Sequence, residues 1–131
     1  DMAAALRAVP AGLFFTEAGE GRIACDPAQF GDAVLGRKDV PASYHLAVTQ
    51  DDARQGVTLV TRGQDLKPAT HLQRLLQALM GWPEPAYAHH PLLLGPDGRR
   101  LAKRDRAATL AELRAAGRSA AELRAMAGFP D

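Results

Sequence analysis

An alternation of strand-like and helix-like segments after residue 43 constrains the fold of this chain more than any other feature. Residues 57–61, Val-Thr-Leu-Val-Thr, alternate branched apolar side chains with threonine, which is typical of a strand. Residues 69–80 carry leucines at helical spacing, and residues 87–94 are suited to a second, buried strand. A strand, a helix and a strand in this order predict an α/β fold with a parallel sheet. So few strands indicate that the sheet is incomplete.

Capping residues set the expected bounds of the two central helices. Ser43 can cap a helix from residue 44 to about residue 55, and Gly56 can end it in the left-handed conformation. Pro68 opens a second helix, over Ala69 or Thr70 to Met80, which Gly81 ends. The residues expected to share one face are Leu46, Ala47, Gln50 and Ala53 in the first helix, and Leu72, Leu75, Leu76 and Leu79 in the second.

Shorter elements are expected on both sides of this centre. A helix over residues 2–9 should stop at Pro10, and a turn with two glycines favours a β-hairpin near residue 20. Asp26 can cap a brief helical turn. Two amphipathic helices are predicted near the carboxyl end, and the second opens with a Ser-x-x-Glu capping box. The expected ranges are 13–16 and 22–25 for the hairpin strands, 27–30 for the turn, 33–37 for a further strand, 38–43 for a loop, and 109–116 and 119–126 for the helices.

The composition fits one ordinary globular domain or a piece of one, because 47% of the 131 residues are hydrophobic and 24% are charged. No run approaches the roughly 18 apolar residues that cross a membrane, and no leader opens the chain. The single cysteine, Cys25, excludes an internal disulfide, which favours a cytoplasmic protein. Because the chain begins at Asp1 and not at methionine, we expect that it is part of a longer parent polypeptide.

A cluster of cations lies between Arg99 and Arg106, although the formal net charge of the whole chain is only +1. Any polyanion must therefore bind this cluster locally. Cations on a flexible segment can close over a triphosphate and stabilise the charge that develops on its leaving pyrophosphate. Lys103 is the best candidate, with Gly95 and Gly98 giving the loop its freedom. The alternative is a solvated basic turn between a strand and a helix.

Arg62 and Tyr44 are candidate ligands for an amino acid with a carboxylate side chain. A guanidinium can bind both carboxylate oxygens at once and stays charged, and Arg62 follows a predicted strand, where ligands of open α/β sheets bind. The phenol of Tyr44 can add an orienting hydrogen bond. Alternatively, Arg62 ends a strand in solvent and Tyr44 packs at the start of a helix.

A metal site is not expected from the acidic and histidine pairs. Asp51 and Asp52 would point about 100° apart on a helix, so they are interpreted as polar helix residues. His89 and His90 would face opposite sides of a strand, one buried and one exposed. Cys25 is interpreted as a small core residue.

Four motifs occur in one order: Tyr44-His-Leu-Ala47, Val60-Thr-Arg-Gly-Gln-Asp-Leu66, Pro91-Leu-Leu-Leu94 and Arg100-Leu-Ala-Lys-Arg104. Together they resemble the second half of the class I glutamyl-tRNA synthetase catalytic domain. The last motif is similar to the Lys-Leu-Ser-Lys-Arg signature of that family, with Arg100 in place of the first lysine and Ala102 in place of serine. The family usually has an apolar pair where this chain has Thr49 and Gln50.

The resemblance implies a Rossmann-type α/β fold in three segments: 1–43 with the hairpin, 44–106 as the second half of the catalytic core with the signature loop 100–104, and 107–131 as a helical tail. It further implies roles for single residues. Tyr44 and Arg62 would bind glutamate, Asp65 would hold the loop after Arg62, and Lys103 would be catalytic. The residues implied to contact ATP are Lys103, Arg100, Leu92 and Leu93.

Within the family, the pattern is most similar to a short branch without an anticodon-binding domain, the glutamyl-queuosine tRNA(Asp) synthetases. The resemblance implies that glutamate attacks ATP, which is accompanied by Mg²⁺, and that the glutamyl group passes to queuosine in tRNA(Asp). Arg62 and Lys103 would bind opposite ends of one glutamyl-adenylate. The first half of the domain, with its His-Ile-Gly-His type motif and any zinc site, would lie upstream, so this chain alone should be inactive.

Three alternatives stay open at this point. The chain could belong to a glutamyl-tRNA synthetase that charges tRNA(Glu). It could be a non-catalytic module that binds RNA or a partner through the basic loop and the tail helices. It could also be a proteolytic remnant that fills its open sheet edge with another chain.

Overall fold

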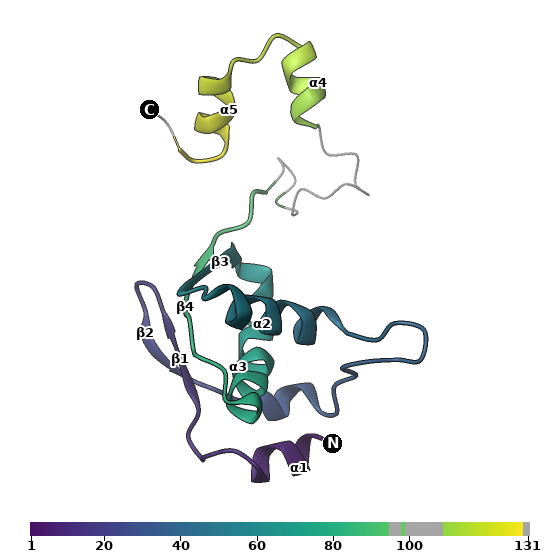
Figure 1. Ribbon diagram of the computed structural model, residues 1–131. Coiled ribbons are helices and arrows are strands. Elements are labelled where there is room, and N and C mark those ends of the chain that lie inside the picture. Colours follow the sequence, from purple (N-terminus) through teal and green to yellow (C-terminus); the bar gives the residue numbers. More distant parts are fainter. Residues whose placement is uncertain (95–97, 99–108, 130–131) are drawn as a thin grey trace. The chain divides into compact units, whose positions relative to one another are not determined.

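The computed structural model describes residues 1–94, 98 and 109–129. They belong to two compact units, Asp1–Pro91 and Leu92–Asp131. The first unit contains a four-stranded sheet with helices packed on it, and the second contains two short helices (Figure 1).

The sheet is mixed, and its strand order is β2-β1-β4-β3. The strands are β1 (Phe14–Glu17), β2 (Gly21–Ala24), β3 (Leu59–Gly63) and β4 (Ala86–His90). β1 and β2 form an antiparallel hairpin, whereas β4 runs parallel to both of its neighbours. The predicted hairpin and the predicted parallel sheet are therefore confirmed. They share one sheet because β1 pairs with β4, where Ala18 N–H donates to Tyr87 O at 2.7 Å.

Two long helices pack against each other in the first unit: α2 (Tyr44–Gln55) and α3 (Ala69–Met80). The Oγ of Ser43 accepts a hydrogen bond from Leu46 N–H at 3.4 Å, as the capping pattern predicts. Gly56 and Gly81 end the helices with φ of 68° and 65°, a region that glycine enters without steric cost. The predicted bounds of both helices are confirmed. A short helix α1 (Met2–Arg7) precedes the hairpin.

The core lies between α3 and the sheet, with α1 at one end. Phe15 and Tyr87 of the sheet are fully buried and meet edge to face, with ring centroids 5.6 Å apart. Leu72 and Leu75 of α3 form a cluster with Met2 of α1. The expected leucine stripe is therefore confirmed for most of its length, but Leu79, in the last turn of α3, is 38% exposed.

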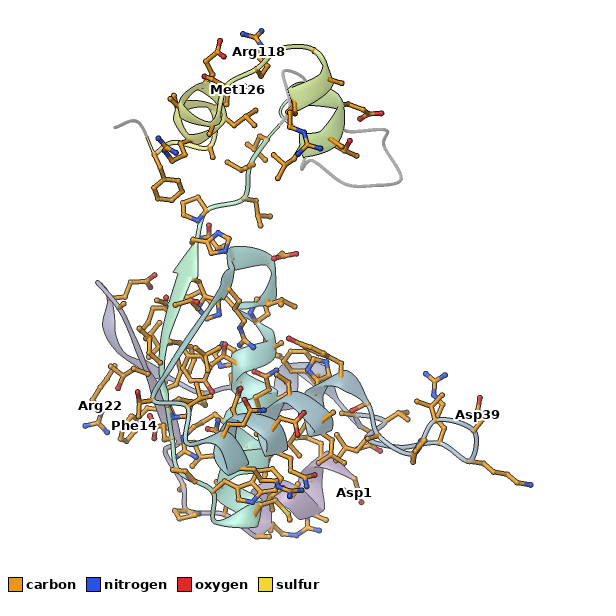
Figure 2. All side chains as sticks on the ribbon, turned by 45° about the horizontal axis from the view of Figure 1, so that its top comes forward. Asp1, Phe14, Arg22, Asp39, Arg118 and Met126 are labelled. Carbon is orange, nitrogen blue, oxygen red and sulfur yellow. The ribbon has the colours of Figure 1, made fainter. Side chains whose placement is uncertain are left out.

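The predicted strand over residues 33–37 is wrong, because this segment has no regular structure. Its backbone groups bond within the same loop: Arg37 N–H donates to Val40 O, and Ser43 N–H donates to Leu35 O. The loop extends away from the sheet, with Asp39 near its tip (Figure 2). Branched residues such as Val34 favour strands, but a strand forms only where a partner strand is available.

The inner face of α2 also differs from the prediction. Thr49 is 2% exposed, whereas Gln50, which was expected on the shared face, is exposed. The hydroxyl of Thr49 donates to His45 O at 2.7 Å, so burial leaves its polar atom bonded. Leu46, Ala47 and Ala53 are half-buried as predicted, so the prediction is wrong only in placing Gln50 on this face, where Thr49 lies instead.

The short helices are confirmed. A 3-10 helix, η1 (Pro27–Phe30), forms where a turn was predicted, although the Asp26 side chain makes no capping bond. A second one, η2 (Gln64–Leu66), follows β3 and was not predicted. In the second unit, α4 (Leu110–Ala115) and α5 (Ala120–Met126) each begin with a capping box, formed by Thr109 and Glu112 and by Ser119 and Glu122.

Candidate functional site

The side chain of Arg62 is the centre of a polar cluster at the carboxyl end of β3. Its Nε donates to Nε2 of His89 at 3.0 Å, its Nη1 to Oε1 of Gln73 at 2.6 Å, and its Nη2 to Oγ1 of Thr70 at 2.5 Å. Thr70 and Gln73 come from the first half of α3 and are buried, whereas Arg62 itself is half-buried. The strand and the helix thus fix the guanidinium from two sides.

A buried carboxylate completes this cluster from the hairpin. Glu17, at the end of β1, accepts the backbone N–H of His89 on Oε1 at 2.8 Å, and its Oε2 lies 2.7 Å from Nδ1 of the same residue. The two side chains are only 2% and 1% exposed. Residues of β1, β4, β3 and α3 therefore meet in one hydrogen-bonded network.

The proton positions in this network follow from the charge of arginine. A guanidinium stays protonated in proteins, so Nε of Arg62 is a donor and Nε2 of His89 must be the acceptor. The neutral imidazole then carries its proton on Nδ1 and donates it to Glu17. The contact between His89 and Glu17 is therefore a hydrogen bond between a carboxylate and a neutral imidazole.

The ionisable groups around Arg62 are shifted by burial and by its charge. Burial alone would raise the pKa of Glu17, but hydrogen bonds from the backbone and side chain of His89 bring it below its ordinary value. Burial, and then the charge of Arg62, lower the pKa of His45, so this residue is neutral at pH 7. Burial raises the pKa of Asp52 even though the charge of Arg62 opposes the shift.

Two buried polar atoms near Arg62 have no hydrogen-bond partner among the described residues, namely Nδ1 of His45 and Nε2 of Gln73. Buried groups of this kind are rare, and they often occur at functional sites. Gln73 already uses its oxygen to accept from Arg62, so its unpaired N–H groups lie beside the guanidinium. The polar cluster thus has donor capacity beyond its internal bonds.

Tyr44 begins α2 next to His45, and its ring centroid lies 5.5 Å from that of His45. Its side chain is 52% exposed. An open hollow of about 270 Å³ lies against it, lined by Val34, Gly36, Arg37, Val40, Ser43 and Tyr44. Tyr44 is therefore accessible from solvent at the start of α2, and its role in binding a ligand stays a prediction.

The residues predicted to contact ATP belong to the second unit, which begins at Leu92. Leu92 is half-buried and Leu93 is 49% exposed. Arg100, Ala102 and Lys103 lie outside the described residues, as does most of the basic loop. The predicted ATP contacts of this loop stay predictions.

The acidic and histidine pairs behave as expected. Asp51 is exposed while Asp52 is half-buried, as expected of neighbouring residues on a helix. The side chain of His89 is buried and His90 is exposed, and Nδ1 of His90 lies 3.0 Å from Pro91 O. Within residues 1–94, 98 and 109–129, no group of three His, Cys, Asp or Glu side chains could hold a metal ion. Among the same residues, no helix is long and apolar enough to span a membrane.

Cys25 is half-buried, and it is not a member of the main core cluster. Burial raises the pKa of its thiol to about 11, so it is protonated at pH 7. This agrees with a packing role, although the residue is only half-buried.

Sequence reasoning missed the three partners of Arg62, which are Thr70, Gln73 and His89, and it missed Glu17, which bonds to His89. Thr70 and Gln73 follow Arg62 by eight and eleven positions, and a polar pair on the inner face of a helix is a signal that could have indicated a buried partner. Glu17 and His89 are 72 positions apart, and only the strand order brings them together.

Comparison with known proteins gives a consistent result. A family model described as the catalytic domain of class I tRNA synthetases (E and Q) matches residues 8–126. A glutamyl-Q tRNA(Asp) synthetase of Rhodobacter capsulatus is 52% identical over 99 residues, which are 76% of this chain and 36% of that protein. One from Nocardia farcinica is 54% identical over 95 residues, or 72% of this chain and 30% of that protein. The chain thus spans about a third of the length of these relatives.

A solved structure is also similar. A glutamate tRNA ligase from Elizabethkingia meningosepticum, crystallised in complex with its amino acid, superposes with a TM-score of 0.61 at 34% sequence identity. The match covers 71% of this chain and 19% of that one. The mixed sheet and its helices therefore form part of a catalytic domain of this type.

Proposed function

The chain belongs to the catalytic-domain family of class I tRNA synthetases (E and Q), and we propose that it is part of an enzyme that activates glutamate with ATP. The activity would reside in the longer parent polypeptide, of which this chain supplies the second half of the catalytic domain. The relatives support this proposal, because the chain covers only 36% and 30% of their lengths. On its own, the chain is expected to be inactive.

The observation that carries the proposal is the hydrogen bonding of Arg62. A guanidinium has five N–H groups, and three of those of Arg62 bond to His89, Gln73 and Thr70. One N–H on each terminal nitrogen is left without a described partner. Two N–H groups are what a carboxylate accepts in a bidentate pair, so Arg62 is suited to the side chain of glutamate. An uncharged glutamine side chain would gain much less from the same group.

Tyr44 would bind the same substrate from the start of α2. Its exposed phenol, 52% accessible beside an open hollow, can donate a hydrogen bond and form a wall of the pocket. The neighbouring unpaired N–H groups of Gln73 add donors near Arg62. The site would thus recognise an anionic amino acid mainly through hydrogen-bond donors.

ATP and the transfer step are proposed from the family alone. An α-carboxylate oxygen of glutamate would attack the α-phosphorus of ATP, and the bond from that phosphorus to the oxygen it shares with the β-phosphate would break and release pyrophosphate. Mg²⁺ would accompany ATP and neutralise part of the phosphate charge. Lys103 and Arg100 would stabilise the charge on pyrophosphate, and the backbone of Leu92 and Leu93 would line the adenine.

The proposed acceptor is queuosine in tRNA(Asp), because relatives that are 52% and 54% identical carry the name glutamyl-Q tRNA(Asp) synthetase. Transfer to tRNA(Glu) is the second candidate, and the glutamate tRNA ligase that is 34% identical supports it less strongly. We propose that the activation of glutamate and its transfer to tRNA take place in the cytoplasm, in keeping with the single cysteine.

The test is glutamate-dependent exchange of pyrophosphate into ATP, measured with the parent polypeptide and with the 131-residue chain. The parent should catalyse exchange with glutamate and not with glutamine or aspartate. The 131-residue chain should catalyse no exchange with any of them. Acceptance of labelled glutamate by tRNA(Asp) with queuosine, and not by the same tRNA without it, would support the acceptor. Exchange by the 131-residue chain, or its absence from the parent, would contradict the proposal.

A Lys103→Ala variant separates the enzyme from an RNA-binding module. For an enzyme, exchange is lost while the affinity for tRNA changes little. For a module, RNA binding weakens for every sequence, and its dependence on salt becomes less steep.

A further inference from the structure

The buried pair Glu17 and His89 does not face solvent, and the proposed reaction uses neither residue directly. Both side chains are at most 2% exposed. Yet His89 holds Arg62 through Nε, the one guanidinium nitrogen that carries a single N–H. The pair therefore helps to orient the guanidinium, together with Thr70 and Gln73.

The charges in this network balance without direct contact. Arg62 is positive and Glu17 is negative, and the neutral imidazole of His89 lies between them. A buried charge requires compensation, but a carboxylate placed directly on Arg62 would occupy two of its N–H groups. The imidazole acts as a spacer: it provides compensation through one N–H and leaves the terminal nitrogens to Thr70, Gln73 and a ligand.

The acceptor at position 17 must be a carboxylate for this arrangement to hold. Glu17 faces two donors of His89, the backbone N–H on one oxygen and Nδ1–H on the other. A glutamine of the same shape has only one acceptor atom and would place its NH₂ group against one of these donors. If the NH₂ group faces the ring, the imidazole must accept on Nδ1 and protonate Nε2, which then opposes the N–H of Arg62 across 3.0 Å.

We propose that Glu17 and His89 are positioning residues for glutamate binding: Glu17 fixes His89 as the Nδ1–H tautomer, and His89 orients Arg62 toward the substrate carboxylate. This inference rests on the proposed function of Arg62. It also gives the hairpin a role in the site, because Glu17 lies at the end of β1, where that strand meets β4.

The test is the isosteric variant Glu17→Gln in the parent polypeptide. In pyrophosphate exchange, KM for glutamate should rise about tenfold, which corresponds to roughly 1.4 kcal/mol, while kcat and KM for ATP change less than about twofold. The matched control is Glu20→Gln in the same hairpin. Glu20 is 56% exposed and contacts Lys67, not Arg62 or His89. The Glu20→Gln variant should therefore have an unchanged KM for glutamate.

A purely structural role predicts a different pattern. If Glu17 only stabilised the fold, Glu17→Gln would lower Tm and the active fraction, and KM for glutamate and for ATP would both stay unchanged. That result, with an active parent and an Arg62→Ala variant that fails to bind glutamate, would overturn the inference and leave the proposed function intact. If Arg62→Ala binds glutamate normally, the proposed function fails as well.

The tautomer provides a second measurement that needs no activity. Nitrogen-15 NMR of the histidine side chains in the parent should show His89 as the Nδ1–H form. Glu17→Gln should shift it toward the Nε2–H form, and Glu20→Gln should not. An Nε2–H or doubly protonated His89 in the unmodified protein would overturn the inference, even if Glu17→Gln proved too unstable for kinetics.

Discussion

The Nε atom of Arg62 lies 3.0 Å from Nε2 of His89, and the two residues are register partners on the neighbouring parallel strands β3 and β4. The pairing of these strands thus brings His89, and not a neighbouring residue, to the guanidinium. A slip by one residue would turn His89 to the other face of the sheet and leave Arg62 without this acceptor. The candidate site depends on strand register as much as on residue identity.

Acid should weaken the contribution of Glu17 to stability. Burial alone raises the pKa of this carboxyl, yet hydrogen bonds from His89 lower it below the ordinary 4.5. A lowered folded-state pKa means that the stabilisation is complete above the unfolded-state pKa and is lost as pH falls through the folded-state value. In urea unfolding, the difference in unfolding free energy between the unmodified protein and Glu17→Gln should be constant near neutral pH and shrink below about pH 4.5. A difference that grows in acid would contradict this.

The buried pair of Tyr87 and Gln77 offers a test of hydrogen-bond satisfaction. Nε2 of Gln77 donates to the Tyr87 hydroxyl at 2.9 Å, and both residues are at most 2% exposed. Tyr87→Phe should cost about 1–3 kcal/mol, because it leaves the amide buried without this partner. Adding Gln77→Met should recover most of that loss, since both polar groups are then removed. The measurement is the free energy of unfolding of both single variants and of the double variant. A double variant whose loss equals the sum of the two single losses would contradict the account.

Two leucines of α3 should differ strongly in their importance. Leu75 is 1% exposed in the core cluster, whereas Leu79 is 38% exposed in the last turn. Leu75→Ala should lower the free energy of unfolding by about 2–5 kcal/mol. Leu79→Ala, the matched control on the same helix, should cost less than about 1 kcal/mol. If both variants lose the same free energy of unfolding in urea, the position of the core described here is contradicted.

The loop before α2 should be sensitive to a single methyl group. A Cβ added to Gly36 would lie 2.7 Å from the backbone oxygen of Pro41, so the loop must shift. This loop lines the hollow beside Tyr44. Gly36→Ala should therefore raise KM for glutamate severalfold in the parent, with little change in KM for ATP. The control is Asp39→Ala, which removes an exposed side chain near the tip of the same loop that does not line the hollow and should leave both constants unchanged.

Local signals in the sequence were sufficient to predict the helices. Ser43, Gly56 and Gly81 act within one helical turn, so the bounds of α2 and α3 could be predicted and are confirmed. The position of Arg62 at the end of a strand was predictable for the same reason. Where structure depends on distant partners, the sequence was insufficient: residues 33–37 have β-prone side chains but no strand to pair with.

The network around Arg62 could not be predicted either. Glu17 and His89 meet because β1 is inserted beside β4, and no residue near either one indicates that order. The isolated pattern of a glutamate in a hairpin and a histidine in a strand is common. Only the structure shows that three N–H groups of Arg62 donate to protein partners.

The central claim is that Arg62 binds the side-chain carboxylate of glutamate, and Arg62→Lys in the parent polypeptide tests it most directly. Lysine keeps the positive charge but cannot form a bidentate pair or satisfy three fixed acceptors. In glutamate-dependent pyrophosphate exchange, KM for glutamate should rise at least about tenfold, the effect of losing roughly 1.4 kcal/mol, while KM for ATP stays within about twofold. An Arg62→Lys enzyme with an unchanged KM for glutamate would contradict the account.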